Sequence, residues 1–153
     1  MKVTNEIIEF DKLRSKVLKY IVYKKRTEIE VRQKFKDIDE SILEKIIDDM
    51  KALEYIDDDV YIDKAVKEFM RLKNMSLKEV RYKLITKGLG STLIENYIDK
   101  NIDELKEFEL QSAKNIVLKK CKTEECPTEM IGEVVGYLGR KGYTSDTIRN
   151  AVG

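Results

Sequence analysis

The chain has 153 residues, of which 42% are hydrophobic and 39% are charged, and it contains seven glycines and one proline. The charged fraction is well above the usual quarter, which suits thin layers of amphipathic helix better than one thick core. The 30 Lys and Arg residues balance 29 Asp and Glu residues, so the chain lacks the basic excess of a protein that binds duplex DNA as its main activity.

The sequence contains no histidine and only two cysteines, Cys121 and Cys126. This composition disfavours a closed zinc site and excludes catalytic arrangements that need histidine. The N-terminus lacks an apolar stretch of signal-peptide length, and no window approaches the about 20 apolar residues that cross a bilayer. We therefore expect a cytoplasmic protein with reduced thiols, without catalytic residues, bound metal or cofactor, and without membrane association.

Apolar residues recur at helical spacing from Phe10 in the first stripe to Leu138 near the end. Strict alternation never persists, so the sequence predicts an all-α fold without a sheet. In chain order, the predicted helices span residues 5–23, 28–36, 40–54, 59–73, 77–87, 91–100, 103–120, 128–141 and 145–152.

Helix-start residues stand at the breaks between these stripes. Thr27 and Glu30 match a capping box, in which the hydroxyl and the carboxylate each satisfy a free backbone N–H, and Ser76 with Glu79 repeats the pattern. Gly88 and Gly142 follow apolar helical runs, where a residue with positive φ can end a helix. The other predicted N-caps are Asp39, Asp57 or Asp58, Ser91 and Ser145.

The helices fall into three similar groups. When Val31, Val80 and Val134 are placed in register, other apolar positions coincide, and the last two groups share a lysine–glycine pair. The aligned positions are Phe35 with Leu84 and Leu138, Leu43 with Ile94 and Ile148, Ile47 with Ile98 and Val152, and Lys87-Gly88 with Lys141-Gly142. The sequence thus predicts three three-helix repeats, at 1–55, 56–101 and 102–153, packed as an elongated, curved array.

Two segments of the sequence contain residue types that also occur in catalytic or phosphate-binding sites. Consecutive aspartates at Asp57, Asp58 and Asp59 point in different directions, so a helix-capping role explains them better than a two-metal nuclease does. Lys87 precedes Gly88, which is the reverse of the order in a phosphate-binding P-loop. We expect structural roles for Asp57, Asp58, Gly88 and Gly142.

Basic residues recur on the second helix of each repeat. Two explanations remain open: a solvated face interlaced with carboxylates, or a basic rim that meets phosphates or an acidic protein surface. The residues are Arg32 and Lys34, which match Arg81 and Lys83, and Lys87, which matches Lys141 with Arg140 beside it. Tyr82, Tyr97 and Tyr137 are expected in or at the edge of the core rather than as base-stacking platforms.

Four segments together resemble the RecX family of RecA regulators. The resemblance covers residues from about 12 to 152, with Val60, Ile62, Lys141 and Tyr143 departing from the usual family residues. The segments are Thr27 to Val31 (TEIEV), Tyr55 to Tyr61 (YIDDDVY), Ser76 to Leu89 (SLKEVRYKLITKGL) and Tyr137 to Tyr143 (YLGRKGY).

This resemblance implies a regulator that binds the groove of the RecA filament on single-stranded DNA and represses recombinase and ATPase activity. It would act in DNA repair, recombination and the SOS response, as a monomer with weak direct DNA binding. Arg32, Lys34, Arg81, Lys83, Lys87, Arg140 and Lys141 are the candidate contacts. The residues alone indicate only a helical interaction module. The alternative is a DNA-binding protein built from tandem helix-turn-helix-like units.

Overall fold

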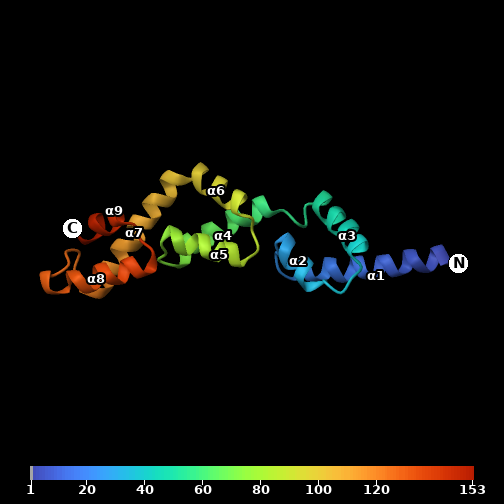
Figure 1. The fold of residues 1–153 in the computed structure, drawn as a ribbon, viewed down its shortest axis with the longest axis horizontal. Helices are drawn as coiled ribbons and strands as arrows, with labels where there is room; N and C mark the ends of the chain where they lie inside the picture. The colour runs from blue at the N-terminus through green and yellow to red at the C-terminus, as the bar shows by residue number, and fades with distance from the viewer. Residues whose placement is uncertain (1) are drawn as a thin grey trace. The chain divides into compact units, whose positions relative to one another are not determined.

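The computed structural model describes residues 2–153, which form nine α-helices and no strand (Figure 1). The all-α prediction is confirmed, and the predicted helix bounds agree with the structure to within three residues. Residue 1 of the predicted first repeat lies outside the described residues. The helices are α1 Lys2–Tyr23, α2 Glu28–Lys34, α3 Glu40–Ala52, α4 Asp58–Leu72, α5 Leu77–Thr86, α6 Ser91–Lys100, α7 Ile102–Cys121, α8 Thr128–Lys141 and α9 Ser145–Val152.

The chain divides into two compact units. The first runs to Tyr61 and includes Lys87–Leu89, and the second contains Ile62–Thr86 and Gly90–Gly153. The division into three repeats remains a prediction. None of the helices within residues 2–153 is long and apolar enough to cross a membrane.

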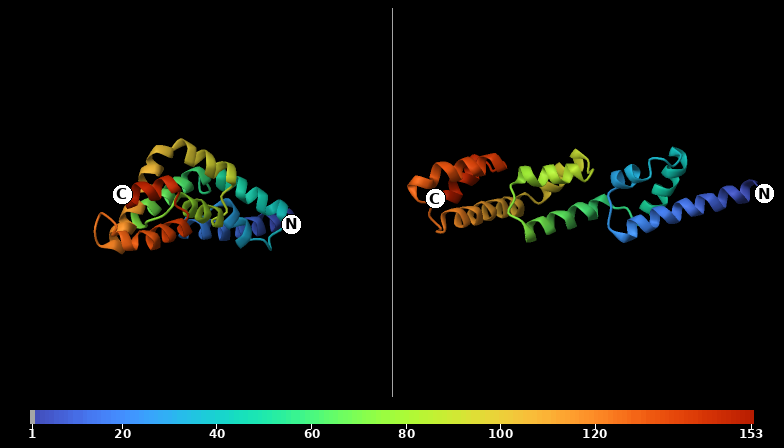
Figure 2. Two further views of the ribbon diagram at one scale, coloured as in Figure 1. Left: turned by 60° about the vertical axis from the view of Figure 1, so that its left-hand side comes forward. Right: turned by 90° about the horizontal axis from the view of Figure 1, so that it is seen from below.

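The first unit has its core where α1, α2 and α3 meet. In Figure 2 (right), α2 and α3 lie on the same side of α1. Ile46, Ile47 and Met50 recur on one face of α3 and are fully buried against Val17 of α1 and Val31 of α2. Burial of each such side chain stabilises the folded chain by about 1.5–3 kcal/mol, which holds a helix as short as α2 in place.

The second unit is organised around α7. This helix contacts α8 and α9, and it also touches α5 and α6. Ala113 and Val117 on α7 are buried with Val134 and Leu138 of α8 and Ile148 of α9. The small side chain of Ala113 allows the neighbouring helices to approach α7 closely.

Most of the predicted helix starts are confirmed. Thr27 and Glu30 form the capping box of α2, and Asp39 accepts hydrogen bonds from Ser41 N and Ile42 N at the start of α3. At the start of α5, Glu79 N donates to Ser76 Oγ over 3.1 Å and Ser76 N donates to Glu79 Oε1 over 3.1 Å.

Two predicted N-caps are wrong by one residue. The N-cap of α6 is Gly90, whose extended backbone places Ser91 inside the first turn, and no side chain caps this helix. The N-cap of α9 is Thr144, whose hydroxyl accepts a hydrogen bond from Thr147 N, so Ser145 is the first helical residue. Adjacent residues compete for the cap at both starts, and the backbone conformation decides between them.

Each capping box also contacts a lysine–glycine turn from further along the chain. Thr27 Oγ1 donates a hydrogen bond of 2.6 Å to the carbonyl of Lys87, and Ser76 Oγ donates one of 2.6 Å to the carbonyl of Lys141. Both hydroxyl residues are fully buried. We call each arrangement of a capping-box hydroxyl and a lysine–glycine turn a joint.

Glycine is required in both turns. Gly88 has φ of +86° and Gly142 has φ of +98°. A Cβ at Gly88 would lie 2.6 Å from Cβ of Ile29, and one at Gly142 would lie 2.8 Å from Cβ of Lys78. Positive φ and the close approach together explain why these glycines follow α5 and α8.

Candidate functional site

The second unit brings three of the predicted contact residues together. Lys83 of α5 and Arg140 and Lys141 of α8 line a shallow groove of about 270 Å³. Lys78, Glu79 and Tyr82, all from α5, complete its lining. We call this surface, made of these six residues, the basic groove.

The basic groove carries four cationic side chains and one carboxylate. Glu79 is engaged twice, because it forms the capping box with Ser76 and lies 3.4 Å from the ammonium group of Lys141. Its negative charge is therefore balanced within the groove, and a net positive surface remains. Such a surface attracts phosphates or carboxylates even though the whole chain is almost neutral.

Aromatic rings lie beside these cations. Tyr82 is 69% exposed, so its ring faces solvent within the groove lining. Lys120 Nζ lies 3.9 Å from the centroid of Tyr137, and Lys141 Nζ lies 5.9 Å from the same centroid. Lys83 Nζ lies 5.9 Å from the centroid of Phe69. An exposed ring next to cations is the combination that single-stranded nucleic acids favour, because bases stack and phosphates pair.

Arg81 lies outside this groove lining, although it is on α5. Its guanidinium donates to both carboxylate oxygens of Glu95 on α6, with distances of 2.8 and 3.4 Å. This fork-to-fork geometry fixes α5 against α6. The pair gives Arg81 a structural function that any role in partner binding must accommodate.

Arg32 makes the equivalent ion pair in the first unit. It contacts Glu44 of α3 at 2.8 Å and Glu28 of α2 at 3.0 Å, and the hydrogen bonds that the guanidinium donates to these carboxylates raise its pKa. The sequence register that aligns Leu43 with Ile94 also aligns Glu44 with Glu95. An ion pair therefore joins equivalent positions in the two units: Arg32 of α2 to Glu44 of α3, and Arg81 of α5 to Glu95 of α6.

The remaining predicted contacts also lie in the first unit. Lys34 is exposed on α2, with its Nζ 5.8 Å from the centroid of Tyr20. Lys87 follows α5, and its backbone carbonyl accepts the hydrogen bond from Thr27. The groove in the second unit contains none of Arg32, Lys34 and Lys87.

The aspartates predicted to be structural accept hydrogen bonds from backbone N–H groups at the starts of two helices. Asp57 Oδ1 accepts a hydrogen bond of 3.2 Å from Val60 N at the start of α4. Asp58 Oδ1 accepts one of 3.2 Å from Glu28 N, at the first residue of α2. Partial burial raises the pKa of Asp58, against the lowering effect of this hydrogen bond. Within residues 2–153, no group of three or more His, Cys, Asp or Glu side chains could hold a metal ion.

Sequence reasoning misplaced one tyrosine and missed one lysine of the groove. Tyr82 was expected at the core edge but is largely exposed, because Val80 and Leu84 define the buried face of α5 and position 82 lies opposite both. Lys78 was not singled out, although it lies two residues after the capping-box serine, Ser76. The expectation for Tyr97 and Tyr137 is confirmed, since both are half-buried.

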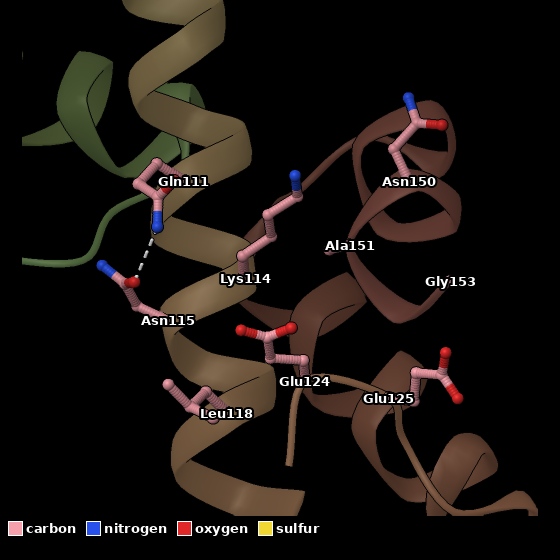
Figure 3. Close-up of a pocket in the computed structure, with 9 residues that line it drawn as sticks. All are labelled: Gln111, Lys114, Asn115, Leu118, Glu124, Glu125, Asn150, Ala151 and Gly153. Carbon is pink, nitrogen blue, oxygen red and sulfur yellow. Dashed lines mark hydrogen bonds between the residues drawn. The ribbon is translucent and has the colours of Figure 1, made fainter.

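A second hollow, of about 460 Å³, lies between α7, the connection to α8, and α9 (Figure 3). Lys114 reaches into it from α7, and Glu124 and Glu125 border it from the connection. Gln111 Nε2 donates to Asn115 Oδ1 over 2.9 Å along its edge. Its charges are mixed, so the basic groove is the better candidate for binding an anionic partner.

Comparison with known proteins places the chain in a family. Regulatory protein RecX of Clostridium botulinum (strain Eklund 17B / Type B) is 34% identical over 147 residues, which cover 92% of this chain and 67% of that protein. Regulatory protein RecX of Clostridium beijerinckii is 30% identical over 158 residues, covering 99% of this chain and 72% of that protein. No protein-family model matches the chain.

Solved structures agree with the sequence comparison. A crystal structure of regulatory protein RecX matches with a TM-score of 0.76 at 26% identity, covering 93% of this chain and 72% of that one. The crystal structure of RecX from Lactobacillus salivarius has a TM-score of 0.81 at 20% identity, covers 95% of this chain and 96% of that one, and shows the shared fold. Sequence identity over nearly the full length, together with this fold, shows that the chain belongs to the RecX family of regulatory proteins.

Proposed function

We propose that this chain regulates the recombinase RecA, by binding the RecA filament on single-stranded DNA and repressing ATP turnover and strand exchange. The observation that carries the proposal is the 34% sequence identity between this chain and a regulatory protein RecX over 92% of the chain. In this proposal the chain acts by occupying a surface rather than by catalysis.

The basic groove is the proposed contact with the filament. Lys83, Arg140 and Lys141 come from two helices whose packing fixes their spacing, so they present a preformed positive surface. We expect a nearly neutral chain with a local cationic surface to bind a protein–DNA filament better than naked DNA, because protein contacts supply the remaining affinity.

The test uses RecA assembled on circular single-stranded DNA with ATP. Wild-type chain at substoichiometric ratios is expected to slow both ATP hydrolysis and strand exchange. The double variant Lys83→Glu and Arg140→Glu reverses two charges of the groove. It should bind the filament at least roughly tenfold more weakly and lose most of its salt dependence.

A matched control reverses two exposed lysines of the same unit outside the groove, Lys64→Glu on α4 and Lys106→Glu on α7. It carries the same change in net charge and should retain repression. If the groove variant represses as well as this control does, the groove is not the contact surface. If wild-type chain affects neither reaction, the regulatory proposal itself is wrong. Tight binding to naked duplex, without any effect on RecA, would instead favour the DNA-binding alternative.

A further inference from the structure

The two cysteines of the chain lie against each other at the connection between α7 and α8. Cys121 is the last residue of α7, and Cys126 precedes Pro127 at the start of α8. Their Sγ atoms are 2.9 Å apart, and the residues are 7% and 9% exposed. Both belong to the core of the second unit, where each sulfur has the other as a neighbour.

This placement suits a covalent bond between the two sulfurs. A disulfide has an S–S distance of about 2.05 Å, so the sulfurs would have to approach by less than about 1 Å. Residues 122–125 are exposed and lie outside the helices, which leaves their backbone free to adjust. We propose that Cys121 and Cys126 form a reversible dithiol–disulfide pair that closes the connection between α7 and α8.

The reaction is a thiol–disulfide exchange with a small disulfide such as oxidised glutathione. One cysteine thiolate attacks a glutathione sulfur, which forms a mixed disulfide and releases the first glutathione thiolate. The second cysteine thiolate then attacks the protein sulfur of that mixed disulfide and releases the second glutathione. Two electrons pass from the cysteines to the oxidant, and the two cysteine protons end on the two glutathione thiols or in solvent.

The environment of the thiols makes this exchange slow but leaves it possible. The contact with Cys121 and the burial of the sulfur raise the pKa of Cys126 to about 11. Little of Cys126 is therefore ionised near neutral pH, and the thiolate is the reactive form. The exposed connection has to open before the oxidant can reach the sulfurs. The rate of oxidation therefore depends on this opening as well as on the exchange reaction.

Bond formation would also affect the hollow described above. Glu124 and Glu125, which border that hollow in Figure 3, lie inside the ring that a Cys121–Cys126 bond closes. Closing this short ring restricts the unfolded chain and fixes the connection between its two ends. The oxidised form should therefore be the more stable form, and the hollow should have one rigid edge.

The test uses the whole chain in isolation, so its outcome is independent of the proposed action on RecA. The folded protein is incubated with mixtures of reduced and oxidised glutathione, quenched with acid, alkylated with a maleimide, and weighed by mass spectrometry. We expect the wild type to lose both free thiols together with the mass of two hydrogens. We also expect its melting temperature to rise by about 5 °C, reversibly with dithiothreitol.

The single variants Cys121→Ser and Cys126→Ser provide the matched controls. Each keeps one sulfur and should accumulate a glutathione adduct that the wild type resolves, while the double variant should show no oxidant-dependent change in melting temperature. The proposal is overturned if the wild type keeps both thiols, accumulates the same adducts as the single variants, or forms cross-linked dimers.

Discussion

Glu109 is a carboxylate in the core of the second unit and is only 3% exposed. Its Oε2 accepts a 2.6 Å hydrogen bond from Leu77 N, the first backbone N–H of α5, and its Oε1 accepts one of 2.9 Å from the Thr147 hydroxyl on α9. One side chain of α7 therefore satisfies a free helix-start donor and anchors a second helix. A buried carboxylate persists in such a place because both oxygens have donors.

Removing this side chain should be costly. Glu109→Ala leaves the Leu77 N–H without its partner in a buried site, and we expect a loss of about 3 kcal/mol in the free energy of unfolding. Urea unfolding followed by circular dichroism measures this loss. The control Glu107→Ala alters an exposed residue of the same helix and should change stability by less than about 0.5 kcal/mol. Equal effects of the two variants would show that the hydrogen bonds of Glu109 contribute nothing net.

The joints explain at the scale of helices why glycine follows α5 and α8 but not α2. The turns after α5 and α8 each bring a backbone carbonyl to a buried hydroxyl and pass within van der Waals contact of a side chain. The residue after α2 is Phe35, a C-cap with φ of −110°, and its carbonyl accepts a hydrogen bond of 3.0 Å from the nearby backbone N–H of Ile38. The glycines therefore reflect contacts with an earlier part of the chain as well as helix termination.

Gly142, the C-cap of α8, and Gly139, inside α8, test this explanation. Gly142→Ala forces a Cβ to within 2.8 Å of Lys78 and into a φ of +98°, so we expect a loss of about 2–3 kcal/mol in stability. Gly139→Ala, within the same helix and with nothing within 4 Å of the new Cβ, should be neutral or stabilising by up to about 1 kcal/mol. The melting temperatures of both variants test this expectation. If Gly142→Ala melted at the wild-type temperature, the joint as described would be contradicted.

Across the whole molecule, the near balance of charge makes stability depend on particular carboxylates rather than on net repulsion. Burial acts to raise the pKa of Glu28, but hydrogen bonds from Lys51 and Arg32 outweigh it and lower this pKa overall. The hydrogen bond from Arg32 lowers the pKa of Glu44 in the same cluster. A lowered carboxylate pKa gives stability that is present above its unfolded value and is lost as pH falls through the folded value.

Acid should therefore weaken the first unit through this cluster. We expect the free energy of unfolding of the wild type to fall as the pH drops below about 4.3, the ordinary pKa of glutamate. Glu28→Gln should flatten that decline at a cost near pH 7 of about 0.5–1 kcal/mol. Asp58 acts in the opposite direction, because its raised pKa gives stability that is lost as pH rises through the folded value. Urea titrations between pH 3 and 7 would contradict the assignment if both proteins declined equally.

Much of this architecture could be predicted from the sequence because its signals are local. Capping boxes at Thr27 and Ser76 and the apolar spacing in α3 depend on neighbours within one or two turns, and the helix bounds followed from them. The buried role of Glu109 depends on α5 and α9, although its place between Leu105 and Ala113 on one helical face was a visible signal.

The candidate site was less predictable for the same reason. Repetition along the chain grouped Arg81 with Lys83. In the structure, Arg81 pairs with Glu95 of α6, whereas Lys83 lines the basic groove. The groove forms only when α8 meets α5, and that meeting follows from packing on α7 rather than from spacing in either helix. Family resemblance identified the kind of protein, whereas the candidate contact surface could be described only from the three-dimensional structure.

The joints also set an order of events during synthesis. The carbonyl that accepts from Thr27 lies 60 residues later in the chain, and the carbonyl that accepts from Ser76 lies 65 residues later. At about 5–20 residues per second, a ribosome supplies each acceptor roughly 3–13 s after its donor. During this interval, the hydroxyl of each capping box lacks the carbonyl that it contacts in the folded chain. The hydroxyls of Thr27 and Ser76 can reach their acceptors only after this later sequence has been synthesised.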